Sequence, residues 1–173
     1  MRRTLSIGLV LALLCVWPTV AIAAISFVGS AVGSSSPNTG TTVSLTALTG
    51  GSDTSPSLGD IIIVVAGVGD TADNGLAAPA EGGYTDVLGA GDLYSNDAND
   101  ANLDLFYKFH NGSDTAVTFA AVGGTNASNV AIVMVFRGVD IDSPLDVATT
   151  TATGIDTSNA APPSINHNGT AGI

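Results

Sequence analysis

The sequence predicts an all-β fold, an antiparallel β-sandwich of the jelly-roll-like or Ig-like type, and three observations indicate it. Segments of strand length are rich in β-branched residues or alternate between apolar and polar residues. Turn-forming Gly, Asn, Asp and Pro residues separate these segments at intervals of about 8–12 residues, as in a sandwich. Long polar helix formers are scarce, because the chain contains a single Glu, Glu81, and a single Lys, Lys108.

The first three expected strands have different patterns. Residues 25–32 include several apolar side chains and are expected to form the first strand. Residues 41–47 alternate with a period of two, which places Val43 and Leu45 on one face. In residues 60–68, five consecutive β-branched residues are typical of a strand buried on both faces, and the flanking glycines argue against a buried helix.

The next three expected strands surround a turn signal. Residues 84–88 form a short strand, and residues 103–110 alternate between an apolar face and a mixed face. Asn111-Gly112 is a turn signal, and residues 116–121 follow it. We therefore expect residues 103–110 and 116–121 to pair as antiparallel neighbours.

The last expected strands bring the number to seven or eight in one domain that spans residues 24–173. Residues 129–137 form an apolar strand, and residues 145–151 form a short eighth strand. Residues 162–165 look like the start of another strand, but no closing hairpin follows. We expect the sandwich to be incomplete at its C-terminus and the sequence to be part of a longer gene product.

Residues 1–23 have the three-part pattern of a secretory signal peptide. A basic start precedes an uncharged apolar run at residues 5–16, and Ala21-Ile22-Ala23 is a small-x-small cleavage site. The run is shorter than the roughly 20 apolar residues that span a bilayer, which argues against a membrane anchor. Cys15 has no small residue directly before it, which argues against a lipoprotein. The sequence predicts a bacterial protein that is secreted, extracellular or at the cell surface, with the periplasm left open and no membrane insertion after cleavage.

The charge of the processed chain excludes some partners. Only Lys108 and Arg137 remain against 15 acidic residues, so the charge is −13. Such a surface repels phosphate backbones and anionic lipids, and nucleic-acid binding is not expected. The processed chain also has no cysteine, so disulfides cannot stabilise it.

Four ordered segments carry a resemblance to a known family. They are residues 59–65 (GDIIIVV), 82–89 (GGYTDVLG), 105–119 (with LFYK, NGSD and VTF) and 135–146 (with VFRGVD and SPLD). The pattern resembles a widespread family of β-rich domains in phage tail-fibre-like and bacterial secreted proteins. Tyr84 stands where the family usually has Trp, and Asp114 where it usually has Glu. The resemblance implies a β-rich fold, a setting outside the cell or on a particle surface, and no known catalytic site.

The residues offer little support for catalysis. A nucleophilic triad needs Ser or Cys near His and Asp, but the processed chain has no Cys and no Gly-x-Ser-x-Gly motif. His110 and His167 are two distant histidines, too few for a zinc site. We therefore expect no enzyme activity. Arg137 is expected to have a structural role by bridging to Asp140 or Asp60 at a strand end.

An acidic segment at residues 92–104 is the best candidate for a metal site. Ca²⁺ binds carboxylate and amide oxygens, and Asp97, Asp100, Asn102 and Asp104 could supply them. The glycine of an EF-hand loop is absent, and the twelfth position counted from Asp100 is not Glu. Two alternatives therefore stay open: a calcium site, or a solvated loop in which Asn and Asp side chains make local hydrogen bonds.

The sequence is compatible with three functions. The first is a secreted, non-catalytic β-sandwich module with a structural, surface or adhesion role. The alternative is a carbohydrate-binding module, calcium-dependent or not, although only Tyr84 and Tyr94 offer aromatic surfaces outside the long strands. The third is a hydrolase, for which no set of residues is evident. Expected partners are surface glycans or other surface proteins.

Overall fold

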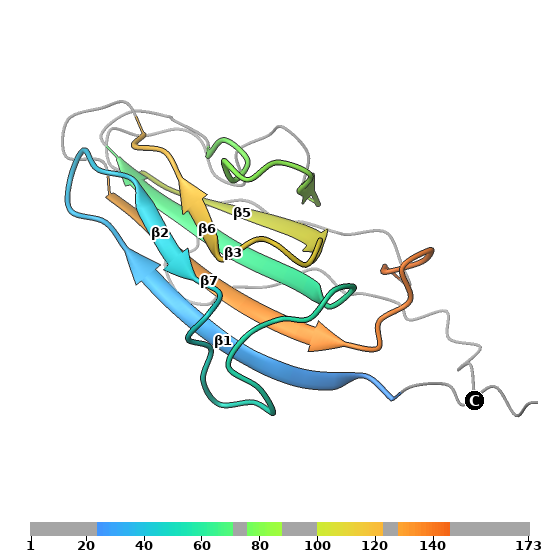
Figure 1. Cartoon of the computed structure of the whole chain (residues 1–173). Helices are drawn as coiled ribbons and strands as arrows, with labels where there is room; N and C mark the ends of the chain where they lie inside the picture. Colours follow the sequence, from blue (N-terminus) through green and yellow to red (C-terminus); the bar gives the residue numbers. More distant parts are fainter. Residues whose placement is uncertain (1–23, 71–75, 88–99, 123–127, 146–173) are drawn as a thin grey trace, which may run out of the picture.

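The computed structural model describes residues 24–70, 76–87, 100–122 and 128–145, and these ranges form an all-β structure without helices (Figure 1). The described strands are β1 (Ser26–Ser34), β2 (Thr41–Ser44), β3 (Ile61–Asp70), β4 (Thr85–Asp86), β5 (Asp100–Phe109), β6 (Ala116–Phe119) and β7 (Ser128–Arg137). One sheet has the order β1-β7-β3-β5-β4, and β2 and β6 form the other. All pairs are antiparallel. The predicted all-β class is confirmed.

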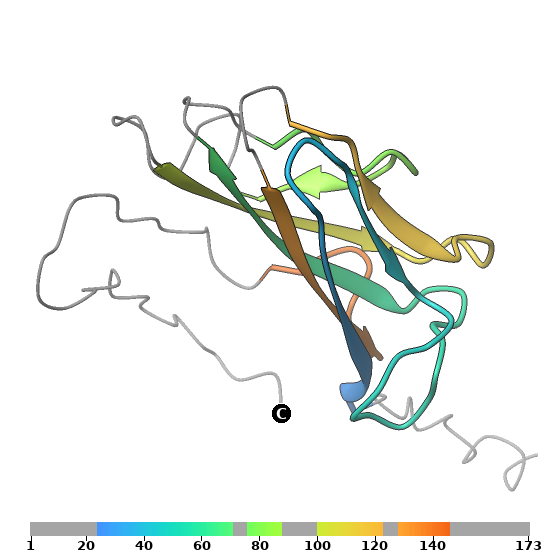
Figure 2. The ribbon, with the colours of Figure 1, turned by 90° about the vertical axis from the view of Figure 1, so that its left-hand side faces the viewer.

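The two sheets pack face to face. Seen from two directions, β2 and β6 lie over one face of the five-stranded sheet (Figures 1 and 2). The rings of Phe106 on β5 and Phe119 on β6 meet across the layers with centroids 5.9 Å apart. Alternate residues of the strands point into this layer, as period-two patterns require. The core consists of Val28, Val43, Leu45, Leu48, Ile62, Val64, Ala66, Phe106, Val117, Phe119, Ala131, Val133 and Val135.

The predicted pairing of the strands before and after Asn111-Gly112 is wrong. Strand β5 pairs with β3 and β4, whereas β6 pairs with β2 in the other sheet. The Asn111 side chain accepts hydrogen bonds from the backbone N–H groups of Ser113 and Asp114, which widens the connection beyond a two-residue hairpin. The chain therefore crosses from one sheet to the other at this turn.

Several predicted strand bounds also change. The strand expected at 41–47 ends at Ser44, where the Leu45 N–H bonds to the Thr115 carbonyl. The strand at 84–88 shortens to two residues, and β5 starts at residue 100 rather than 103. Leu145 lies outside the described strands, and the rest of the expected eighth strand lies outside the described residues.

Strand β3 is the centre of the larger sheet, between β7 and β5. The side chains that face β2 and β6, such as Ile62 and Val64, are fully buried. Ile63 and Val65 point to the opposite face and remain partly exposed. The expectation of burial on both faces is met at Ile61, which is 3% exposed, but only in part at Ile63 and Val65, because the two-stranded sheet covers only one face.

The predicted signal peptide, residues 1–23, lies outside the described residues. Within the described ranges, no helix is long and apolar enough to cross a membrane.

Candidate functional site: two ion-pair clusters at one end of the sandwich

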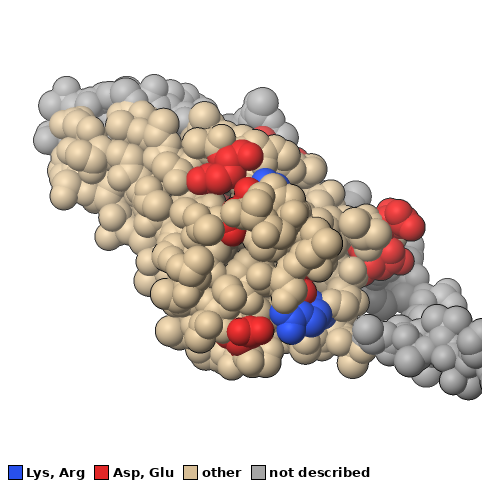
Figure 3. All heavy atoms as spheres, viewed as in Figure 1, with Lys and Arg blue, Asp and Glu red and all other residues tan. Residues whose placement is uncertain are grey.

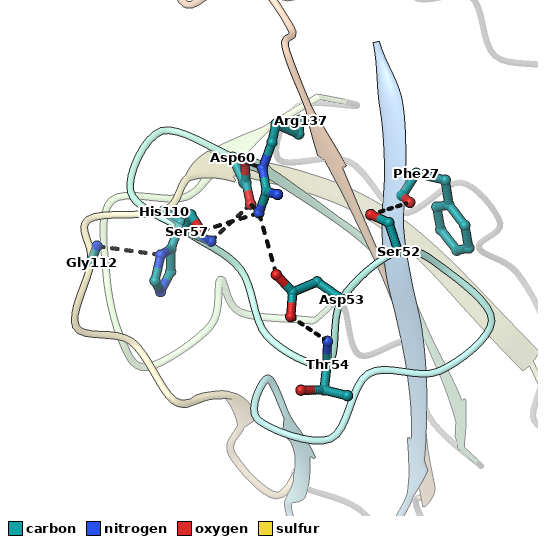
Figure 4. Close-up of polar contacts among 9 residues, drawn as sticks. All are labelled: Phe27, Ser52, Asp53, Thr54, Ser57, Asp60, His110, Gly112 and Arg137. Carbon is teal, nitrogen blue, oxygen red and sulfur yellow. Dashed lines mark hydrogen bonds and ion pairs between the residues drawn. The ribbon is translucent and has the colours of Figure 1, made fainter.

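Arg137 and Asp60 join the end of β7 to the start of β3. The Arg137 Nε donates to Asp60 Oδ1 at 2.9 Å, and its NH2 donates to Asp60 Oδ2 at 2.8 Å (Figure 4). The same NH2 group donates to the Ser57 hydroxyl at 3.1 Å, and the Ser57 N–H donates to Asp60 Oδ2 at 2.8 Å. This two-point contact fixes the strand end in one orientation. Asp53 adds a longer ion pair at 3.9 Å.

The environment of Asp60 favours its charged form. Burial alone would raise the pKa of the Asp60 carboxyl group. The hydrogen bonds from Arg137 and from the Ser57 backbone, together with the positive charge of Arg137, outweigh burial and lower that pKa. Of the two carboxylates considered as partners for Arg137, Asp60 makes the ion pair, while Asp140 accepts a hydrogen bond from the Asp142 N–H at 2.9 Å.

Lys108 and Asp114 form a second ion pair, between β5 and the loop before β6. Their Nζ and Oδ2 atoms are 2.6 Å apart, and the side chains are only 9% and 10% exposed. Lys108 lies on the inner face of β5, and its Nζ is 5.3 Å from the centroid of the Tyr84 ring. Burial raises the pKa of Asp114, but the hydrogen bonds from Lys108 and Asn111 and the charge of Lys108 lower it overall.

The hydroxyl group of Tyr84 is buried and has no hydrogen-bond partner. Burial, followed by the nearby charges of Glu81 and Asp114, raises the pKa of Tyr84. Glu81 itself accepts a hydrogen bond from the Thr118 N–H at 3.0 Å, and the Ala80 N–H donates to the Thr118 carbonyl at 2.8 Å. The segment before β4 therefore protects the free edge of β6.

His110 is buried and both ring nitrogens have partners. The Gly112 N–H donates to Nδ1 at 3.3 Å, so Nδ1 carries no proton (Figure 4). Nε2 then donates to the Asp114 carbonyl at 3.0 Å. Within the described ranges, neither ring nitrogen is hydrogen-bonded to a serine hydroxyl. The two hydrogen bonds of the ring stabilise the turn that connects the two sheets.

The three predicted calcium ligands that the structure describes do not lie in a loop. Asp97 is outside the described residues, whereas Asp100, Asn102 and Asp104 occupy alternate positions of β5. Positions 100 and 104 of a strand are about 13 Å apart, too far for carboxylates at both to bind one ion. The Leu105 N–H donates to Asp104 Oδ1 at 3.1 Å. Among the described residues no group of three or more His, Cys, Asp or Glu could hold a metal ion. The calcium site stays a prediction, and it would require β5 to open.

Sequence reasoning missed the Lys108–Asp114 pair and the buried Asn129. The Asn129 Nδ2 donates to the Ala120 carbonyl at 2.8 Å, and its backbone N–H donates to the Ser35 hydroxyl at 2.8 Å. One signal was available for Lys108: it shares a face of its strand with Phe106, which is a core residue. No comparable signal marks Asn129.

Comparisons with protein-family models, curated proteins and solved structures give no significant match. The resemblance to the phage tail-fibre-like family therefore stays a prediction that rests on the sequence segments alone.

Proposed function

We propose that this chain is a secreted, non-catalytic β-sandwich module with a structural, surface or adhesion role. The observation that carries the proposal is that the basic side chains are engaged in structural ion pairs. After residue 3 the chain has only Lys108 and Arg137, and both are in ion pairs that fasten strand ends to loops. Neither is left to bind an anionic substrate or transition state, as hydrolases of charged substrates require.

The other candidate catalytic groups support the same proposal. His110 uses both ring nitrogens to hold a turn, and the Ser57 hydroxyl is bonded to Arg137. On the face that carries β2 and β6, basic groups lie against carboxylates and most of the surface is uncharged (Figure 3). The polar contacts of this end of the sandwich thus stabilise a scaffold.

The setting outside the cell rests on the signal-peptide pattern and on the resemblance to phage tail-fibre-like and bacterial secreted domains. The high negative charge fits a soluble exported surface. The carbohydrate-binding alternative has less support, because Tyr84 packs against Lys108 and buries its hydroxyl rather than offering a flat platform.

A combined activity and binding screen tests the proposal. The purified exported chain is assayed on a panel of ester, glycoside, peptide and phosphate substrates, and its fluorescent conjugate is applied to bacterial envelopes and to a glycan array with and without EGTA. We expect no turnover and binding to envelope material. Turnover that disappears in Ser57→Ala and persists in Ser52→Ala would contradict the non-catalytic role. Glycan binding that EGTA abolishes would favour the calcium-dependent alternative.

A further inference from the structure

The five-stranded sheet has a second face that is mostly apolar and carries no charged side chain. We define the outer face as the side chains at positions 27–34 of β1, 130–136 of β7, 61–67 of β3 and 103–109 of β5 that point away from β2 and β6. The strand register aligns them in four rows. One row joins Val32, Ile132, Val65 and Leu105 across four strands. None of the four rows contains an acidic or basic residue.

Much of this face is open to water in the single chain. Val32 is 75% exposed, Val130 53%, Leu103 48% and Ile132 46%. Single exposed apolar residues are ordinary, but these side chains are neighbours in adjacent rows. With strands about 4.8 Å and rows about 6.8 Å apart, four strands and four rows span about 500 Å². The row at the start of β3 adds little open surface, since Ile61 is only 3% exposed. A patch of about 500 Å² is among the larger apolar patches that single proteins expose, and such patches are often functional.

We propose that the outer face packs against the outer face of a second copy of this chain. The charge of the processed chain supports this occupant. Two molecules that each carry −13 repel one another except where they meet through uncharged surface, and the outer face supplies that surface. A two-fold axis in the plane between the two faces would bring the same uncharged rows of both copies together, so that no charge is buried.

The dimensions also fit. Two faces of about 500 Å² together bury about 1,000 Å², the threshold for a biological interface and the size of a weak, reversible one. Sheets that pack face to face lie about 10 Å apart with strands inclined by about 30°, a geometry that apolar rows of this kind allow. At one end of the face the rings of Phe27 and Phe136 already pair at 5.4 Å and present a joint aromatic edge.

Residues 146–173 of the same chain are a poorer match for this face. Their 28 positions contain only four large apolar side chains, Val147, Ile155, Ile165 and Ile173, among many Thr, Ala and Asn residues. They would leave most of the rows uncovered. The self-association inferred here goes beyond the proposed function and does not depend on it.

The mass of the exported chain in solution tests the proposal. Sedimentation equilibrium and light scattering, from low to high micromolar concentration, should give twice the chain mass. Ile132→Asp puts a charge near the middle of the face and should weaken dimerisation by about a hundredfold or more, because each copy would bury an unpaired carboxylate. Leu58→Asp is the matched control, since Leu58 is 77% exposed in a loop outside this face, and it should leave the mass unchanged.

Val32→Asp provides a second variant if Ile132→Asp does not fold, because Val32 lies on the edge strand β1 and is the most exposed member of its row. Circular dichroism verifies that each variant keeps its strands. A wild-type monomer at every concentration would overturn the proposal, as would a dimer that survives both aspartates. A monomer that also fails to bind ANS, a dye for exposed apolar surface, would overturn the proposal and indicate that residues 146–173 cover the outer face.

Discussion

Replacing Asp60 by alanine removes the acceptor that holds Arg137, Ser57 and the start of β3 together. The Asp60 carboxylate is almost fully buried and accepts two hydrogen bonds from Arg137 and one from the Ser57 backbone. Breaking a buried ion pair costs about 3–5 kcal/mol. The Arg137 side chain is 41% exposed and can be resolvated, so we reduce the expected loss to about 2–3 kcal/mol.

Urea titration monitored by circular dichroism measures this loss as a lower urea concentration at the unfolding midpoint, and thermal melting provides a second measurement. At about 2–4 °C per kcal/mol for a chain of this size, the melting temperature should fall by about 4–12 °C. Asp140→Ala is the control, because Asp140 bonds only its own turn, and it should change the free energy of unfolding by less than about 0.5 kcal/mol. Equal effects of the two substitutions would refute the structural role that we give to the Arg137–Asp60 pair.

Four further outcomes follow from the same contacts. The pKa values of Asp60 and Asp114 are lowered in the folded chain, so both carboxylates stabilise the fold above a pH of about 4. This stabilisation is lost as the pH falls through the folded pKa values. In Asp114→Asn the free energy of unfolding should therefore decrease less steeply with falling pH. Tyr84→Phe removes a buried hydroxyl that has no partner, so thermal melting should show unchanged or slightly higher stability, and a loss above about 1 kcal/mol would reveal a missed hydrogen bond. Lys108→Met leaves Asp114 buried without its cation and should cost about 2–4 kcal/mol in urea titrations, whereas adding Asp114→Asn should recover part of that loss. Melting curves in EGTA and in millimolar Ca²⁺ should coincide, because β5 spaces the candidate ligands too widely; a calcium-dependent rise that Asp100→Ala removes would restore the metal site.

Local patterns in the sequence were enough to predict the strands, and not enough to predict their partners. Period-two alternation identified Val43 and Leu45, and both are buried in the core. The Asn111-Gly112 turn was located as well. Its role was misjudged, because the turn crosses between the sheets, and there the side chains of Asn111 and His110 accept hydrogen bonds from the turn backbone. Those bonds have no signature in hydrophobic periodicity.

For the polar site, too, the sequence predicted some features correctly and others not. Arg137 was singled out because it is a rare cation at the end of an apolar strand, and the structure places it against Asp60. Asp100 and Asn102 were assigned to a loop because Asn and Asp favour turns. In the structure they belong to β5, since pairing with β3 along its whole length overrides that local preference.

The distribution of charged and apolar side chains on the two faces of β5 also favours an outer face that is covered. A strand with one face in water ordinarily turns its polar residues outward. In β5 two charged side chains, Asp104 and Lys108, flank the core residue Phe106 on the inner face, while Leu105 and Tyr107 point outward. The inner charge of Lys108 is neutralised by Asp114, so the chain accommodates a charge inside while keeping the outer rows free of charge. Removing the outer rows from water would add to the stability of the fold, and the proposed pairing of two copies would achieve this.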